Sequence, residues 1–165
     1  MEKQLTLMDQ PRIKRTLKRI AIQVWEKIED VDDLIIIGLN ERGFAAANEL
    51  ANHLSTYTEN ASPVYQYTVY GTSTDTKLPD CNDKFVLLVD DVIFSGKTMF
   101  SALSAVCSIY DPKAVEIGVL IDRGHRKFPL STNMSGITVP TETGEHIEVM
   151  LKNGQLEEAI LFKNK

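Results

Sequence analysis

The sequence predicts an α/β fold in which a mainly parallel sheet is flanked by helices. The first observation is a set of apolar runs, residues 34–37, 85–89 and 114–121, with the length and composition of buried strands. The second is that each run is followed by glycine or charged residues, and the first two then by apolar residues at helical spacing. Strands that alternate with helices indicate a parallel sheet, whose functional groups gather at the carboxyl ends of its strands.

Length and composition fit one domain that covers residues 1–165. An apolar content of 43% supplies a core, and a net charge of −5 disfavours a dedicated nucleic-acid-binding protein. No apolar run approaches the roughly 18 residues of a membrane span, and the first residues lack the apolar centre of a signal peptide. Cys81 and Cys107 form neither a metal-ligand spacing nor a disulfide framework. We therefore expect reduced thiols, a cytoplasmic location and no membrane partner.

A helix is predicted from Asp9 onward, because apolar residues recur at helical spacing between Ile13 and Ile28. The residues off this stripe are strongly basic: Arg12, Lys14, Arg15, Lys18, Arg19 and Lys27. A solvated surface is the ordinary explanation of such a charged helix face, and contact with RNA is the alternative.

The run 34–37 is followed by Gly38-Leu39-Asn40-Glu41-Arg42-Gly43, which we expect to be a loop before a helix that reaches Leu54. Gly38 and Gly43 permit unusual backbone angles, and Arg42 offers a fork of donors where backbone N–H groups are also free. Such a loop can hold pyrophosphate oxygens, although an arginine in this position can equally be an ordinary surface residue. Another strand is expected at 64–69, and residues 70–83 have the composition of a functional lid or an ordinary connector.

The central stretch joins the run 85–89 to Asp90 and Asp91, and then to the start of a predicted helix at Ser95, Gly96, Lys97 and Thr98. Unpaired backbone N–H groups and the helix dipole make an anion site at such a helix start. Neighbouring carboxylates would repel a bare phosphate, but they suit a phosphate joined to a sugar, because ionised carboxylates accept hydrogen bonds from hydroxyls. The stretch therefore indicates a ribose 5-phosphate site. The alternative is that the aspartates only cap the next helix.

The run 114–121 ends in Asp122-Arg123-Gly124-His125-Arg126-Lys127, which places one acid and four potential cations at a third strand end. Taken alone, His125 is typical of a surface histidine. Further short strands are expected at 136–139, 146–151 and 156–162.

The acid pair with its Ser-Gly-Lys-Thr loop resembles the phosphoribosyl-diphosphate (PRPP) signature of type I phosphoribosyltransferases. Together with GLNERG, DRGHRKFP and ITVPT, it resembles the PyrR family of pyrimidine-operon attenuators that are also uracil phosphoribosyltransferases. The resemblance extends from about Arg12 to Val149. It implies a type I phosphoribosyltransferase fold, with a small hood over the cleft formed by the last predicted strands, and a dimer or larger homo-oligomer.

The resemblance also implies a role for each loop. Asp90 and Asp91 would hold the ribose hydroxyls, and the 5-phosphate would bind to Ser95, Gly96, Lys97 and Thr98. Pyrophosphate would bind to Asn40, Glu41, Arg42 and Gly43, and the nucleobase to Asp122, Arg123 and His125. Catalysis would rest on Asp90, Asp91 and Arg42, while Mg²⁺ would arrive on PRPP, near Asp122, without a protein site of its own.

The implied reaction joins uracil, or another nucleobase, to PRPP and gives UMP and pyrophosphate. Where the family tends to open a long mobile loop with Tyr-Arg-Asp, this chain has Tyr70-Gly71-Thr72 and a short connector. A PRPP- or nucleotide-sensing regulatory protein with little turnover is therefore the alternative. Lys18 and Ile22 stand where the family often has a threonine and a histidine in a helix linked to RNA contact. We therefore expect weak RNA binding with little sequence preference.

Overall fold

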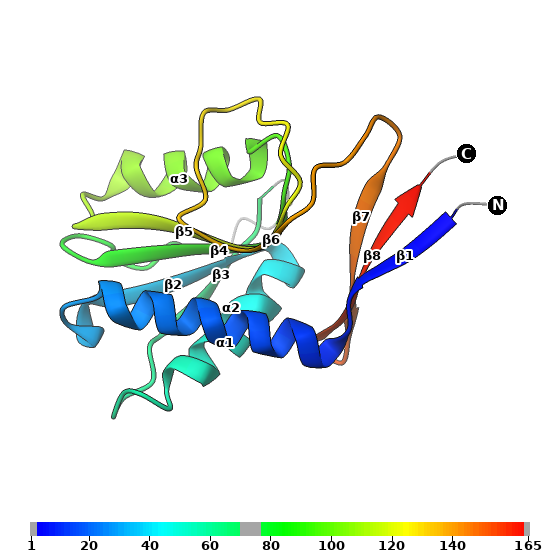
Figure 1. The fold of residues 1–165 in the computed structure, drawn as a ribbon. Coiled ribbons are helices and arrows are strands. Elements are labelled where there is room, and N and C mark those ends of the chain that lie inside the picture. Colours follow the sequence, from blue (N-terminus) through cyan, green and yellow to red (C-terminus); the bar gives the residue numbers. More distant parts are fainter. Residues whose placement is uncertain (1–2, 70–76, 164–165) are drawn as a thin grey trace.

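A five-stranded parallel sheet forms the centre of the computed structural model, which describes residues 3–69 and 77–163. Its spatial order is β3-β2-β4-β5-β6 (Figure 1). The strands are β2 (Leu34–Leu39), β3 (Val64–Tyr67), β4 (Phe85–Ile93), β5 (Ala114–Asp122) and β6 (Met134–Thr138). The predicted α/β fold with a mainly parallel sheet is confirmed.

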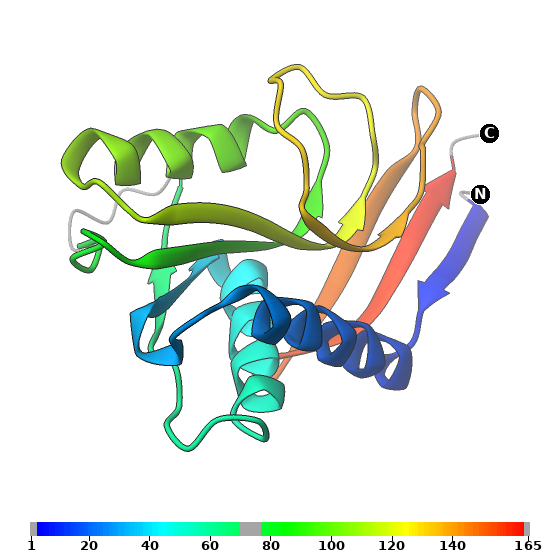
Figure 2. The ribbon, with the colours of Figure 1, turned by 60° about the vertical axis from the view of Figure 1, so that its left-hand side comes forward.

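Helices cover both faces of this sheet, with α1 (Gln10–Lys27) and α2 (Asn40–Leu54) on one face and α3 (Lys97–Ile109) on the other (Figure 2). A short 3₁₀ turn, Val31–Asp33, leads into β2. Alternate residues of β2 and β4 belong to two separate core clusters, with Ile36 and Leu87 on the α1/α2 side and their neighbours on the α3 side. This double burial explains why residues 34–37 and 85–89 contain no polar residue.

The first helix begins as the sequence predicts. Asp9 is the N-cap residue, and its carboxylate accepts a hydrogen bond of 2.9 Å from the Arg12 amide, a cap that typically stabilises a helix by about 1 kcal/mol. The apolar stripe is buried and the basic face is exposed. Two of the basic side chains hold other segments: Arg12 donates to Leu7 O at 2.9 Å, and Arg19 donates to Gly136 O at 2.7 Å.

A second sheet of three antiparallel strands forms the hood beside the N-terminal end of α1 (Figure 1). Its order is β1 (Lys3–Met8), β8 (Gln155–Lys163) and β7 (His146–Lys152), so the two ends of the described chain lie side by side. The sequence of β1 gives no strong strand signal, and this strand was not predicted. The segment 136–139, which was grouped with the hood, instead overlaps β6, which ends at Thr138 and lies at the edge of the central sheet.

Two predicted boundaries were wrong, and both errors affect the site. The segment from Gly38 to Gly43 is not a loop, because β2 runs to Leu39 and α2 starts at Asn40, whose positive φ of 57° turns the chain within one residue. The strand that was expected to end before Asp90 continues through the acid pair to Ile93.

Residues 70–76 of the expected lid lie outside the described residues, and 77–83 contain neither helix nor strand. Among the described residues, no helix is long and apolar enough to cross a membrane.

Candidate active site

The candidate site lies where the winding of the central sheet reverses. From β2 the chain moves outward to β3 and then crosses back to β4 on the other side of β2. Loops that leave the carboxyl ends of two such strands diverge and open a crevice, which is where open α/β sheets bind ligands. The carboxyl ends of β2 and β4 carry the first turn of α2 and the acid pair, respectively.

The acid pair is held in two different environments. Asp90 is buried, with only 8% of its surface exposed, whereas Asp91 is half-buried. The Asp90 carboxylate accepts a hydrogen bond of 2.8 Å from the Asp91 amide. Burial, together with the neighbouring Asp91 carboxylate, raises the pKa of Asp90 well above its usual value. A ribose hydroxyl that donates a hydrogen bond, or a cation, would offset the cost of a buried charge on Asp90.

The first turn of α2 packs closely against the strand that carries these acids. A Cβ atom on Gly43 would lie 2.7 Å from Val89 O and 3.2 Å from Asp90 Oδ1, so only glycine fits here. A Cβ atom on Gly38 would likewise lie 2.4 Å from the Phe44 Cα atom. The two glycines thus bring the Arg42 segment directly beside the acid pair.

Arg42 and Asn40 each tie this turn to another part of the fold. The Arg42 Nε atom donates to Val149 O of the hood strand β7 at 2.6 Å, and the Asn40 side chain accepts from the Val69 amide at 2.9 Å. A cavity of about 450 Å³ is lined by Leu39, Asn40, Glu41, Arg42, Asp90, Asp91, Val92 and Thr98. Both predicted ribose residues and three of the predicted pyrophosphate residues therefore border one space, whereas Gly43 is buried and does not line it.

The predicted phosphate loop forms the N-terminus of α3. Gly96 is the N-cap with a φ of 86°, and no side chain caps the helix from that position. Ser95 Oγ accepts a hydrogen bond from the Lys97 amide at 3.2 Å, while Ser95 O accepts from the Phe128 amide at 3.0 Å. A cavity of about 220 Å³ is lined by Asp90, Val92, Ile93, Phe94, Ser95, Gly96, Lys97, Thr98 and Met99. Backbone N–H groups and the dipole of α3 favour an anion in it.

In the loop after β5, Asp122 is held by internal donors. Its oxygens accept two hydrogen bonds from Arg126, at 2.6 and 2.9 Å, and one each from the Gly124 amide at 2.9 Å and Thr132 Oγ1 at 3.0 Å. Burial acts to raise the pKa of Asp122, but these hydrogen bonds outweigh it and lower the pKa below the ordinary value. These contacts fit an Asp122 that shapes the loop.

Arg123 and His125 lie beside a separate cavity of about 380 Å³ that also has Phe94 and residues 141–145 in its lining. The Arg123 guanidinium lies 4.2 Å from the centre of the Phe94 ring and donates to Glu145 O at 2.8 Å. His125 Nε2 lies 2.5 Å from Thr141 O, so this nitrogen is the one that carries a proton. An aromatic face beside fixed polar groups suits a flat heterocycle.

Sequence reasoning did not single out two residues that the structure brings to this region. Arg126 pairs with Asp122 and also donates to Phe94 O and Leu130 O, each at 3.0 Å. Phe94 lines both the cavity at the N-terminus of α3 and the cavity beside Arg123 and His125. The four-residue spacing of Asp122 and Arg126 could have suggested their ion pair, but Phe94 carried no signal. Within residues 3–69 and 77–163, no group of three His, Cys, Asp or Glu side chains forms a metal site.

Comparison with known proteins identifies this arrangement. Residues 3–151 match the family described as Phosphoribosyl transferase domain. The chain belongs to the phosphoribosyltransferase family. It is 34% identical over 179 residues to the Bifunctional protein PyrR of Alkaliphilus metalliredigens, covering 99% of this chain and 97% of that protein. The PyrR protein of Streptomyces coelicolor is 33% identical, with 96% of this chain and 89% of that protein covered. The predicted PyrR-like membership is confirmed.

Solved phosphoribosyltransferases share the fold. A hypoxanthine-guanine phosphoribosyltransferase of Bacillus anthracis superposes with a TM-score of 0.71 at 24% identity, covering 86% of this chain and 85% of that chain. The hypoxanthine phosphoribosyltransferase of Trypanosoma cruzi superposes with a TM-score of 0.75 at 15% identity, covering 97% of both chains. These likenesses confirm the predicted type I phosphoribosyltransferase fold.

Proposed function

We propose that this phosphoribosyltransferase transfers ribose 5-phosphate from PRPP to uracil and gives UMP and pyrophosphate. The observation that carries the proposal is that Asp90, Val92 and Thr98 line both the phosphate cavity and the cavity beside Arg42. The two cavities therefore adjoin along the acid-bearing strand. A ligand with a phosphate at one end, a sugar in the middle and a pyrophosphate at the other end matches that order.

In this proposal each chemical group of PRPP has partners in the described site. The 5-phosphate binds at the N-terminus of α3, which the sequence analysis assigned to Ser95, Gly96, Lys97 and Thr98. The acid pair accepts hydrogen bonds from the ribose hydroxyls. Pyrophosphate binds beside Asn40, Glu41, Arg42 and Gly43, and Arg42 neutralises part of its charge as it leaves.

The proposed reaction needs no covalent nucleophile from the protein. The site orients the nucleobase and the sugar for transfer, and the positive charge that develops on the ribose ring is stabilised by Asp90 and Asp91. Mg²⁺ bound to PRPP would supply further charge neutralisation of pyrophosphate, and carboxylate oxygens in the lining, from Glu41 and Asp91, are donors that suit it. Arg123 and His125 would border the base, with Asp122 keeping their loop in shape.

A PRPP- or nucleotide-sensing regulatory protein with little turnover is the second candidate. The observation that favours it is the acidic side chain of Glu41 in the cavity lining, because a carboxylate beside the leaving pyrophosphate opposes its negative charge unless a cation intervenes. The connector between β3 and β4 also favours it, because the resemblance to the PyrR family implies a longer mobile loop there. Binding needs only the cradle, but transfer needs water to be excluded. In either case we propose that residues 1–165 form one phosphoribosyltransferase domain.

Calorimetric titration with PRPP and Mg²⁺, followed by product assays, separates these functions. Each of uracil, hypoxanthine, guanine and orotate is supplied with PRPP, and we expect UMP from uracil at about 1 s⁻¹ or faster. PRPP binding without nucleotide product would favour the sensor.

The double variant Asp90→Asn with Asp91→Asn should bind PRPP at least tenfold more weakly. Asp32→Asn, at an exposed site before β2, is the matched control. Unchanged PRPP binding in the folded double variant would contradict the site itself.

A further inference from the structure

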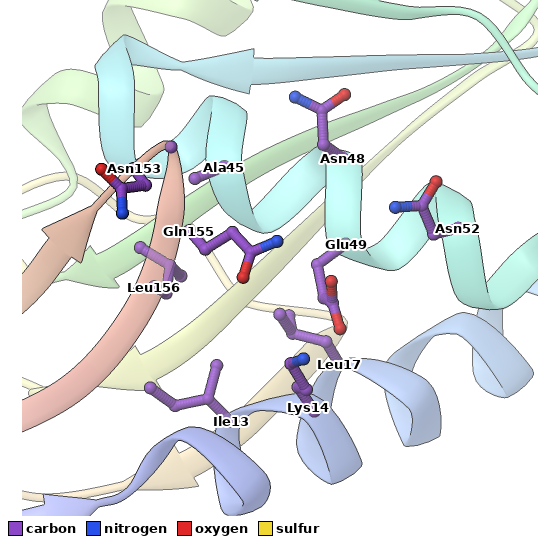
Figure 3. A pocket seen from close by; sticks show the side chains of 11 residues that line it. Ile13, Lys14, Leu17, Ala45, Asn48, Glu49, Asn52, Asn153, Gln155 and Leu156 are labelled. Carbon is purple, nitrogen blue, oxygen red and sulfur yellow. The ribbon is translucent and has the colours of Figure 1, made fainter.

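A cavity of about 220 Å³ lies between α1, α2 and the turn that joins β7 to β8. The positive φ values of Asn153 and Gly154, 52° and 75°, form a tight hairpin turn that brings Gln155 to the cavity (Figure 3). Its volume is that of about seven water molecules in the liquid, enough for one small ring compound. The lining residues are Ile13, Lys14, Leu17, Ala45, Asn48, Glu49, Asn52, Asn153, Gly154, Gln155 and Leu156.

This cavity is separate from the candidate active site. None of its lining residues borders the cavities beside Asp90, Arg42 or His125. Asn48 stands eight residues after Asn40 on α2, which places it about 12 Å further along the helix axis. One ligand could therefore occupy this cavity while another occupies the candidate active site.

The lining combines an apolar floor with a polar rim. Ile13, Leu17, Ala45 and Leu156 are buried and form the floor, on which the flat face of a ring can pack. The rim carries side-chain amides from three places in the sequence, namely Asn48 and Asn52 on α2, Asn153 in the turn and Gln155 on β8. None of these amides is hydrogen-bonded to another described residue. Their donors and acceptors are therefore available to a ligand.

The charged groups of the cavity balance one another. Figure 3 shows the Lys14 ammonium, the Glu49 carboxylate and the Gln155 amide reaching into the same space from α1, α2 and β8. Glu49 Oε1 also lies 3.1 Å from His53 Nε2. One cation and one anion leave no net attraction for a phosphate, and the carboxylate repels it. The site therefore favours a neutral ligand.

Side-chain amides have a specific chemical complement. An amide presents a donor and an acceptor in one plane, so it pairs with a heterocycle edge that carries an adjacent acceptor and donor, as asparagine and glutamine do with adenine. We propose that the cavity between α1, α2 and the β7–β8 turn is a second ligand site, which binds a neutral nucleobase or nucleoside.

The walls of this site connect it to the active site. α2 and the β7–β8 hairpin form opposite sides of the cavity, and the same two elements meet at the hydrogen bond from Arg42 to Val149 O. A ligand that fixes the hairpin against α2 therefore also fixes the distance between the hood and the first turn of α2. Occupation of the second site should thus change the affinity for PRPP, and PRPP should change the affinity for the nucleoside by the same factor.

Calorimetric titration of the full chain with uridine, adenosine, uracil and adenine, without PRPP, tests the site independently of transferase activity. We expect saturable binding of at least one of them with a Kd below about 1 mM. The double variant Asn48→Ala with Gln155→Ala should weaken that binding at least fivefold, because it removes the amides of two walls. Asn60→Ala, at an exposed asparagine after α2, is the matched control and should bind like the original chain.

Three results would overturn the proposal. They are no saturable binding of any of the four compounds, binding that His125→Ala removes but the double variant leaves intact, or tighter binding of UMP or AMP than of the nucleosides at the cavity. Unfolding curves of each variant show whether it is folded. If the double variant is not, Gln155→Ala alone removes the turn-side amide at an exposed position and gives the same discrimination.

Discussion

Replacing Gly43 by alanine tests the close packing between the first turn of α2 and the strand that carries the acid pair. The new Cβ atom would lie 2.7 Å from Val89 O and 3.2 Å from Asp90 Oδ1. A carbon atom cannot stay 2.7 Å from a backbone oxygen, so the turn and β4 must move apart by a few tenths of an ångström. Arg42 is the preceding residue, so it moves with the turn.

Two opposing effects set the magnitude. Forcing an extra methyl group into packed surroundings destabilises a protein by about 1–3 kcal/mol. Alanine in a helix recovers about 0.5–1 kcal/mol relative to glycine. We expect urea unfolding to show a net loss of roughly 1–2 kcal/mol. PRPP affinity should fall further, by about tenfold or more, because one displaced charge-assisted hydrogen bond is worth roughly 1.5–3 kcal/mol.

Gly118→Ala is the matched control. A Cβ atom on Gly118 would have only ordinary contacts, the nearest at 3.7 Å to the Leu87 side chain, although this glycine also lies in the central sheet. The free energy of unfolding should stay the same or rise by up to about 1 kcal/mol, because alanine restricts the unfolded chain. If Gly43→Ala unfolded and bound PRPP like this control, the close approach would not be required, and the reasoning about the pyrophosphate turn would be refuted.

Three further predictions concern charge. The raised pKa of Asp90 means that the folded state binds the Asp90 proton more tightly than the unfolded state does. The free energy of unfolding therefore falls as the pH rises above the ordinary pKa of an aspartate. Asp90→Asn should therefore raise the free energy of unfolding at pH 7 and flatten its pH dependence above about pH 4, the ordinary pKa of an aspartate, and urea curves with no such difference would contradict this. Arg126→Lys keeps the charge but loses the two-pronged contact with Asp122, so urea unfolding should show a loss of about 1–3 kcal/mol, whereas Lys127→Arg should have no effect. RNA binding in gel-shift titrations at about 0.15 M salt should be weak and equal for a pyrimidine-operon leader and a scrambled control, and alanine at three exposed positions of α1 should abolish it. The three positions are Lys14, Arg15 and Lys18. A preference for the leader that UMP strengthens would contradict the prediction of non-specific RNA binding.

The sequence was sufficient for those parts of the fold whose causes are local. The runs 34–37 and 85–89 became central strands because they are apolar throughout, and only a strand buried on both faces needs that composition. The acid pair and the Ser95 loop were located for a similar reason, since a strand end next to a helix start is defined by neighbouring residues. The roles of these residues toward PRPP and the base stay predictions.

The parts that could not be predicted depend on contacts between distant residues. β1 is mostly exposed and has no strong apolar pattern, and its strand structure comes from pairing with β8 at the other end of the chain. Gly38 and Gly43 were expected to permit unusual backbone angles in a loop. In the structure their small size lets the first turn of α2 pack closely against strands, and for Gly43 this reason appears only when β4 is in place. Arg126 looked like one cation in a basic run until Asp122, Phe94 and Leu130 were seen around it.

The hood connects these distant contacts to the chemistry. Its strands come from the two ends of the chain, and Val149 O on β7 receives the Arg42 Nε hydrogen. An arginine that donates Nε to a carbonyl keeps its two terminal nitrogens for a ligand, and its side chain loses rotational freedom before the ligand arrives. The orientation of Arg42, which we propose faces the leaving pyrophosphate, therefore depends on a strand that lies far from it in sequence. This dependence explains why a motif such as GLNERG marks the position of the site but does not fix its geometry.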